Sequence, residues 1–133
     1  MFKYEIGDKT YTQRKLVMGQ IEQLEEQLRD AVFPMTNDPL RIREALGNKV
    51  YMAFAISLVE EGKSPKRDIE ELQAIADDLR WGIDPELTLQ VIEDFFDCNP
   101  IASLFMRLEG LTKKIKEMAQ NIQKVGSKEL LTS

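Results

Sequence analysis

The sequence predicts a mainly α-helical fold, a compact helical domain of about five helices with a short N-terminal β-hairpin. Three observations predict this fold. The stretch Val50–Val59 is apolar at every position except Ser57. Four prolines each follow a residue that caps helix N-termini well, which is typical of helix starts. Only the first 13 residues show the alternation of a strand. The length is that of one domain, so we expect a single domain over residues 1–133.

The N-terminal hairpin is expected over about residues 2–13. Apolar side chains alternate with charged ones from Phe2 to Ile6, which is the strand period. Gly7-Asp8 then suits a two-residue turn with glycine in the first position. The segment Lys9–Gln13 is rich in threonine and tyrosine, which favour strands. Such a hairpin is marginal alone, so we expect it to lie against a helix.

Five helices follow from apolar periodicity and from the cap-proline pairs. The first is an amphipathic helix over 17–33, because one apolar stripe runs along it, made of Val17, Ile21, Leu24, Leu28 and Ala31. The cap-proline pairs are Asp38-Pro39, Ser64-Pro65, Asp84-Pro85 and Asn99-Pro100. They predict helices over 38–61, 65–80, 84–98 and 100–125. Gly47-Asn48 could kink or split the second of these.

The helix that contains Val50–Val59 is expected to be the centre of the core. Its apolar residues cover every side of a helix, so other elements should bury most of its faces. The stretch is too short to cross a bilayer, which requires about 20 apolar residues. A signal peptide has a basic region followed by an apolar stretch, and the residues after Met1 show no such order. We therefore expect no signal peptide. A lone cysteine, Cys98, fits the reducing cytoplasm, and we expect a cytoplasmic protein without a membrane partner.

Composition argues against most catalytic classes. The chain has no histidine, which excludes Ser-His-Asp and Cys-His arrangements. No glycine-rich phosphate loop or calcium-loop spacing occurs. Neighbouring carboxylates such as Glu93-Asp94 point away from each other on a helix, and we interpret them as solvated surface. We therefore expect no catalytic residues, no cofactor and no metal, and we expect Cys98 to be a packing or incidental thiol.

Charge is distributed unevenly along the chain. Glu60–Asp97 holds 12 acidic and 4 basic residues, a net of −8, whereas Arg107–Lys128 holds 6 basic and 2 acidic residues, a net of +4. An acidic body argues against nucleic-acid binding. The two charged regions are either solvated faces or surfaces that steer a partner. Trp81 is expected to cover a helix end, with an exposed partner anchor as the alternative.

The last predicted helix carries an apolar heptad stripe, the C-terminal seam. Its members recur at alternating spacings of four and three, as in a coiled coil. The stripe either packs on the core and the first helix or binds a partner helix or another subunit. We select six of its residues as candidate partner-binding residues: Leu104, Leu108, Leu111, Ile115, Met118 and Ile122.

Two segments resemble the tail assembly chaperones of tailed phages and prophages. The opening FKYEIGDKTYTQRKLVMGQIEQL has the short hairpin and the L-x-x-G-Q helix entry of that family. The segment VIEDFFDCNPIASL is similar to its acidic, aromatic, Asn-Pro junction between late helices. Together they cover about 40 residues. The matching residues are Ile6, Gly7, Lys9, Tyr11, Leu16, Gly19, Gln20, Phe95, Phe96, Asn99 and Pro100.

The resemblance implies a small helper without catalytic activity in the host cytoplasm. Such proteins coat the tape-measure protein, a long helix with exposed apolar stripes, and keep it soluble until tail-tube subunits assemble around it. The implied partners are the tape-measure protein and the tail-tube protein. Two alternatives come from other classes. One is a small helical structural or regulatory subunit that self-associates through the C-terminal seam, and the other is an enzyme that uses carboxylates and a metal.

Overall fold

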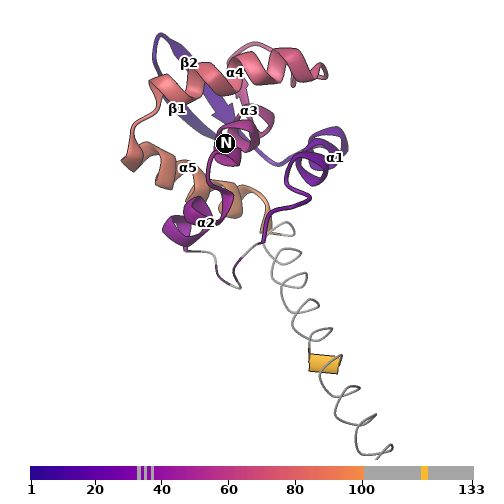
Figure 1. Cartoon of the computed structure of the whole chain (residues 1–133). Helices are drawn as coiled ribbons and strands as arrows, with labels where there is room; N and C mark the ends of the chain where they lie inside the picture. The colour runs from indigo at the N-terminus through magenta and orange to yellow at the C-terminus, as the bar shows by residue number, and fades with distance from the viewer. Residues whose placement is uncertain (33, 35, 37, 101–117, 120–133) are drawn as a thin grey trace, which may run out of the picture.

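The computed structural model describes residues 1–32, 34, 36, 38–100 and 118–119. The chain begins with two strands, β1 (Phe2–Ile6) and β2 (Lys9–Gln13), and continues with α1 (Met18–Gln27), α2 (Pro39–Leu46) and α3 (Lys49–Ser57). A third strand, β3 (Leu58–Glu60), follows α3 directly, and α4 (Ile69–Gly82) and α5 (Pro85–Cys98) complete the described fold. Figure 1 shows α3 in the middle of the other elements.

The expected fold class, mainly α with a short hairpin, is wrong, because the structure is mixed α/β. Its three strands form one antiparallel sheet in the order β1-β2-β3. The predicted hairpin is present, with Tyr4 opposite Tyr11. What the prediction lacked is β3, in which Val59 pairs with Thr12 and Leu58 with Gln13. The Thr12 hydroxyl also donates to the Val59 carbonyl at 3.0 Å.

The helix expected over 38–61 is in fact two helices and a strand. Gly47 separates α2 from α3 with φ 56° and ψ −132°, a conformation that is essentially confined to glycine. Helix α3 ends at Ser57. From Leu58 onward the backbone of β3 forms hydrogen bonds with β2 in place of helical hydrogen bonds. Extended backbone suits Leu58 and Val59 because they are buried on a sheet.

Helix boundaries elsewhere differ from the expectation in instructive ways. The helix expected over 17–33 ends at Gln27. The helix expected over 65–80 begins four residues later, because Asp68 rather than Ser64 is the cap and accepts from the Glu70 N–H at 3.2 Å. The helix predicted over 84–98 is confirmed as α5, capped by Asp84. The helix predicted over 100–125 lies outside the described residues, apart from its helical residues Pro100, Met118 and Ala119.

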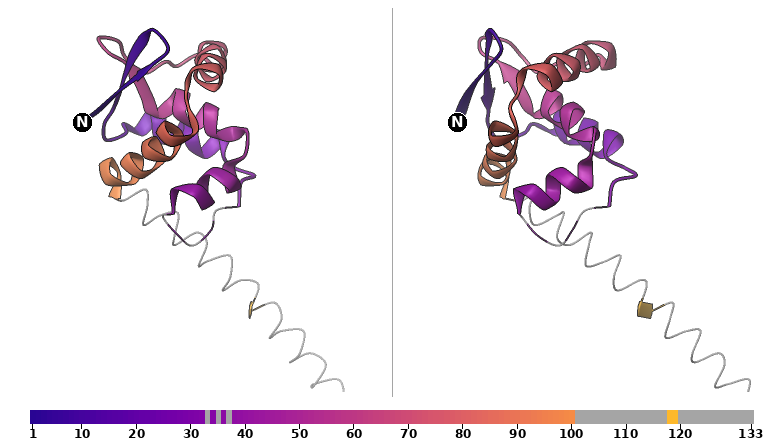
Figure 2. Two further views of the ribbon diagram at one scale, coloured as in Figure 1. Left: turned by 90° about the vertical axis from the view of Figure 1, so that its left-hand side faces the viewer. Right: turned by 60° about the vertical axis from the view of Figure 1, so that its left-hand side comes forward.

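The prediction that α3 is the centre of the core is confirmed. Val50 and Ile56 are 0% and 1% exposed. α3 contacts α1, α2, α4 and β3, so its apolar side chains pack against neighbouring elements on several sides. The two views of Figure 2 show the sheet and α4 on one side of α3, and α2 and α5 on the other. Every face of α3 therefore contributes apolar burial.

Gly47 provides a direct test of the break between α2 and α3. Gly47→Ala should destabilise the chain by about 1–3 kcal/mol, because alanine is strained in this backbone conformation. Gly19 is the matched control, since it lies in α1 without a positive φ and an added Cβ would meet nothing within 4 Å. Gly19→Ala should stabilise the chain by up to about 1 kcal/mol. Urea unfolding measures both, and equal effects of the two substitutions would contradict the assigned conformation.

Candidate partner-binding pocket

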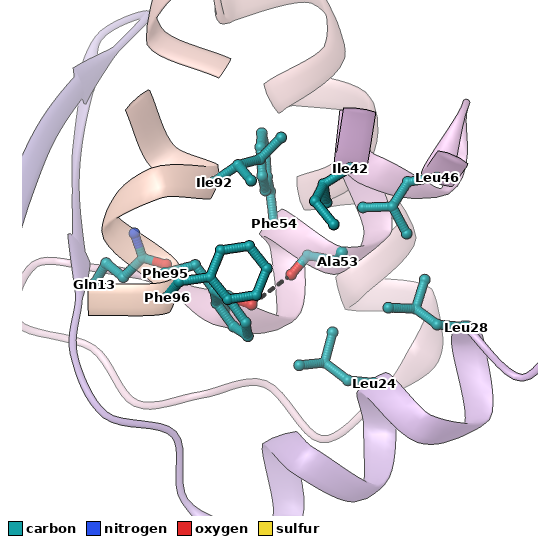
Figure 3. A pocket seen from close by; sticks show the side chains of 11 residues that line it. Gln13, Leu24, Leu28, Ile42, Leu46, Ala53, Phe54, Ile92, Phe95 and Phe96 are labelled. Atoms are coloured by element: carbon teal, nitrogen blue, oxygen red, sulfur yellow. Dashed lines mark hydrogen bonds between the residues drawn. The ribbon is translucent and has the colours of Figure 1, made fainter. Parts of the chain in front are cut away.

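An apolar pocket lies between four helices and the end of β2, and it is the candidate functional site (Figure 3). Its volume is about 40 Å³, room for a few water molecules or a small side-chain tip. Helices α1, α2, α3 and α5 contribute to its walls. The lining residues are Gln13, Leu24, Leu28, Ile42, Leu46, Ala53, Phe54, Ser57, Ile92, Phe95 and Phe96.

Local sequence explains how the walls of the pocket are built. Leu24 and Leu28 belong to the apolar stripe predicted for the first helix. On α5, Phe95 and Phe96 pack edge to face with ring centroids 5.4 Å apart, an arrangement that aromatic rings prefer. Ser57 donates its hydroxyl proton to the Ala53 carbonyl at 2.8 Å. This bond satisfies the only proton that the Ser57 hydroxyl can donate.

A buried polar network forms one side of the pocket. Gln13 is fully buried, and its amide nitrogen donates to the Tyr4 hydroxyl at 2.8 Å and to the Val91 carbonyl at 3.1 Å. Tyr4 in turn donates to Asp94 Oδ2 at 2.7 Å, and Gln90 donates to Asp94 Oδ1 at 2.8 Å. These bonds connect both strands of the hairpin to α5.

The Gln13 amide oxygen is the exception in this network. It is buried and has no hydrogen-bond partner among the described residues. An unsatisfied buried acceptor costs about 1–3 kcal/mol, and such a group calls for an explanation.

Asp94 corrects the interpretation of the Glu93-Asp94 pair as solvated surface. Its side chain is buried, 4% exposed, whereas Glu93 is exposed. Asp94 stands three residues after Val91 on the buried side of α5, so helical periodicity could have identified it. Gln13 gave no such signal, because its partners Tyr4 and Val91 come from distant parts of the chain.

Several residues that carried the family resemblance have structural roles around the pocket. Gln20 is buried, donates to the Ile56 carbonyl at 2.8 Å and accepts from the Val17 N–H at 3.0 Å. It thereby ties the start of α1 to the end of α3. Asn99 accepts from the Leu16 N–H at 2.9 Å and donates to the Phe95 carbonyl at 3.0 Å. Asn99 therefore holds the end of α5 against the segment before α1.

Of the six predicted partner-binding residues, only Met118 is described, and its side chain is 61% exposed. Leu104, Leu108, Leu111, Ile115 and Ile122 lie outside the described residues.

Cys98 and Trp81 were the remaining residues that the sequence singled out. Cys98 is half-buried with its thiol 3.8 Å from the Gln13 carbonyl, and burial raises the pKa of that thiol. A raised pKa makes a thiol a poorer nucleophile at neutral pH. Trp81 does not cover a helix end, because 82% of its side chain is exposed.

A metal site and a membrane-spanning helix are both absent from the described residues. Among them, no group of three or more cysteine, aspartate or glutamate side chains is placed to hold a metal ion. None of the helices in the described part of the chain is long and apolar enough to cross a membrane.

Comparisons with protein-family models, with curated proteins and with solved structures found no match to this chain.

Tyr4→Phe tests the polar network beside the pocket. The substitution removes a donor to Asp94 and an acceptor for Gln13, so it should cost about 1–3 kcal/mol at pH 7. Burial, followed by the hydrogen bond to Asp94, raises the pKa of Tyr4 above its ordinary value near 10. Above about pH 10 the unfolded chain therefore loses the Tyr4 proton first, and the wild-type stability falls as pH rises.

Urea unfolding of both proteins at pH 7 and above pH 10 measures this effect. The difference between wild type and Tyr4→Phe should shrink at high pH. The pKa of Tyr11 is also raised by burial, and both proteins keep that residue, so only the difference between them reports on Tyr4. A difference that stays constant across this range would contradict the assigned network.

Proposed function

We propose that this chain is a non-enzymatic helper that binds an amphipathic helical segment of a partner and keeps that partner soluble. The observation that carries the proposal is the pocket, because apolar walls from four helices can accept the tip of one small side chain from a helix laid across them. The acidic body, with a net charge of −5 for the whole chain, would help to keep such a complex in solution.

The resemblance of the N-terminal and Asn-Pro segments supports a particular partner. We propose that the partner is the tape-measure protein of a tailed phage, bound in the host cytoplasm during tail assembly, with the tail-tube protein as a second partner. In this proposal the C-terminal seam, which the heptad spacing predicts to be helical, is a second apolar surface for the partner. Apolar helical stripes on both partners would pair reversibly, which is what a temporary helper requires.

Exposed apolar residues near the start of α1 support the same type of function. Val17 and Met18 are 54% and 67% exposed. Methionine adapts its shape to different partner side chains. Val17 caps α1 and Met18 is its first residue, so both offer exposed apolar side chains at the start of the helix that contributes Leu24 to the pocket.

Co-expression tests the proposed function. A tape-measure fragment should be largely insoluble alone, and it should become soluble and co-purify when this chain is co-expressed. A fragment that remains insoluble in the presence of the folded chain would contradict the proposal. Light scattering of the purified chain without the fragment tests the alternative of self-association, which predicts a mass that is a multiple of 15.3 kDa.

A further inference from the structure

Strand β1 forms one edge of the three-stranded sheet, and in the part of the chain that the structure describes it pairs with β2 alone. The right-hand view of Figure 2 shows β1 at the outer margin of the sheet, on the side away from β3. An edge strand presents backbone N–H and C=O groups that can pair with a further strand. The β1 edge is therefore a surface at which another chain can add a strand.

A hydrogen bond between Glu61 and Thr10 shows which residues of β1 face this edge. The Thr10 carbonyl accepts from the Glu61 N–H at 2.8 Å, so the backbone groups of Thr10 point toward the β3 side and away from β1. In an antiparallel pair, the residue opposite such a residue also points its backbone groups outward. Glu5 is opposite Thr10, so the N–H and C=O of Glu5 face the open edge. Lys3, two residues earlier on the same strand, faces the same way.

The side chains of Lys3 and Glu5 lie on the solvent face of the sheet. Both are exposed, whereas Tyr4 and Ile6 are buried. Glu5 forms no ion pair among the described residues, and Lys3 forms one with Glu61 at 2.8 Å. Both side chains of that ion pair are 53% exposed. Because a lysine ammonium has three donors, Lys3 can contact a second carboxylate as well.

The sequence of β1 is complementary to itself in charge. When two copies of β1 lie side by side and antiparallel, with Tyr4 opposite Tyr4, Lys3 of each copy is opposite Glu5 of the other. Opposite charges across an antiparallel strand pair are favourable, and like charges are unfavourable. A shift of the register by two residues places either Lys3 opposite Lys3 or Glu5 opposite Glu5. Charge therefore favours a single register, in which the outward backbone groups of Lys3 and Glu5 also face each other.

We propose that two copies of this chain associate through their β1 edges into a dimer. Three strands from each copy then form one continuous sheet, with a two-fold axis between the two Tyr4 residues. Each of the two Lys3–Glu5 pairs exchanges two backbone hydrogen bonds and adds an ion pair. An interface this short gives weak association, so we expect the dimer at protein concentrations on the order of 100 µM.

The dimer goes beyond the proposed function and does not depend on it. No residue of β1 lines the pocket, so each copy has its own pocket. A dimer would present two pockets to one long partner, and two linked contacts bind more tightly than one. Solubilisation of a tape-measure fragment by a strictly monomeric chain would retain the helper function and reject the dimer. A dimer that fails to solubilise the fragment would do the reverse.

Exchange of charge at the two edge positions tests the dimer, with sedimentation velocity across a concentration series as the measurement. Lys3→Glu makes both edge side chains acidic, and Glu5→Lys makes both basic. Either variant alone should associate about tenfold more weakly than wild type or remain a 15.3 kDa monomer. An equimolar mixture of the two variants should recover association, because every acidic side chain again faces a basic one. The double variant Lys3→Glu/Glu5→Lys should dimerise alone for the same reason.

All of these variants should keep the circular dichroism of the wild type, because both side chains are exposed. A dimer that neither single substitution weakens would place the contact on another surface, such as the C-terminal seam, and would overturn the proposal. Single variants that dissociate but do not associate when mixed would overturn the assigned register. A wild-type chain that stays monomeric up to about 1 mM would overturn the dimer itself.

Discussion

Phe54→Asp should prevent stable folding of this chain. Phe54 is 4% exposed, and it lies in the middle of α3 within the main core cluster. Aspartate would remove the aromatic contacts and bury a charge without a partner, and losses of more than about 4 kcal/mol arise from such combinations. That loss is close to the whole stability of a typical domain. Circular dichroism and urea unfolding should show a largely unfolded or aggregated chain.

Leu40→Asp is the matched control for Phe54→Asp. Leu40 lies in α2 with 52% of its side chain exposed, so the same new charge enters water. Its effect on unfolding should stay within about 0.5 kcal/mol, as is usual for surface substitutions. A soluble Phe54→Asp variant with unchanged melting would show that α3 is not the centre of the core.

Replacing both Leu111 and Ile115 with aspartate should abolish association with the partner while folding is retained. These residues belong to the C-terminal seam, whose regular heptad spacing favours a binding face. The described fold already covers α3 with other elements. We therefore expect nearly unchanged circular dichroism and melting, together with loss of co-purification with a tape-measure fragment. If the chain acts instead through self-association, the loss should appear in its mass by light scattering.

Leu28→Asp is the control for the seam variant. Leu28 is 8% exposed and belongs to the core cluster, so its replacement should destabilise the fold by several kcal/mol. Unfolding of the Leu111 and Ile115 double variant would show that the seam is internal packing. Normal folding with undiminished association would show that the seam binds no partner.

Local signals in the sequence were sufficient for much of the helical fold. Asp84-Pro85 predicted α5 because the cap and the proline act on adjacent backbone groups. Val50–Val59 predicted a buried centre, since no helix so apolar on every side is stable in water. Asp68 was a signal that the prediction missed. Glu70 and Glu71 follow it and form an acidic first turn, which favours a helix start at Asp68.

Long-range pairing could not be predicted from the sequence. Nothing in the run from Val50 to Val59 distinguishes the helical residues from Leu58 and Val59, because both parts are equally apolar. The change from α3 to β3 depends on the position of β2, about 45 residues earlier in the chain. Gln13 was missed for the same reason: its burial depends on Tyr4 and Val91, which only the folded chain brings to it.

Hydrogen exchange in a complex with a tape-measure fragment most directly tests whether the pocket receives a partner helix. We predict slower amide exchange in the complex around Leu24 on α1 and around Phe95 on α5, where the pocket walls lie. Exchange in the β1–β2 turn around Gly7 should remain unchanged, because the turn takes no part in the pocket. Protection confined to the turn, or a complex with no protection at α1 and α5, would contradict the assignment of this pocket as the partner-binding site.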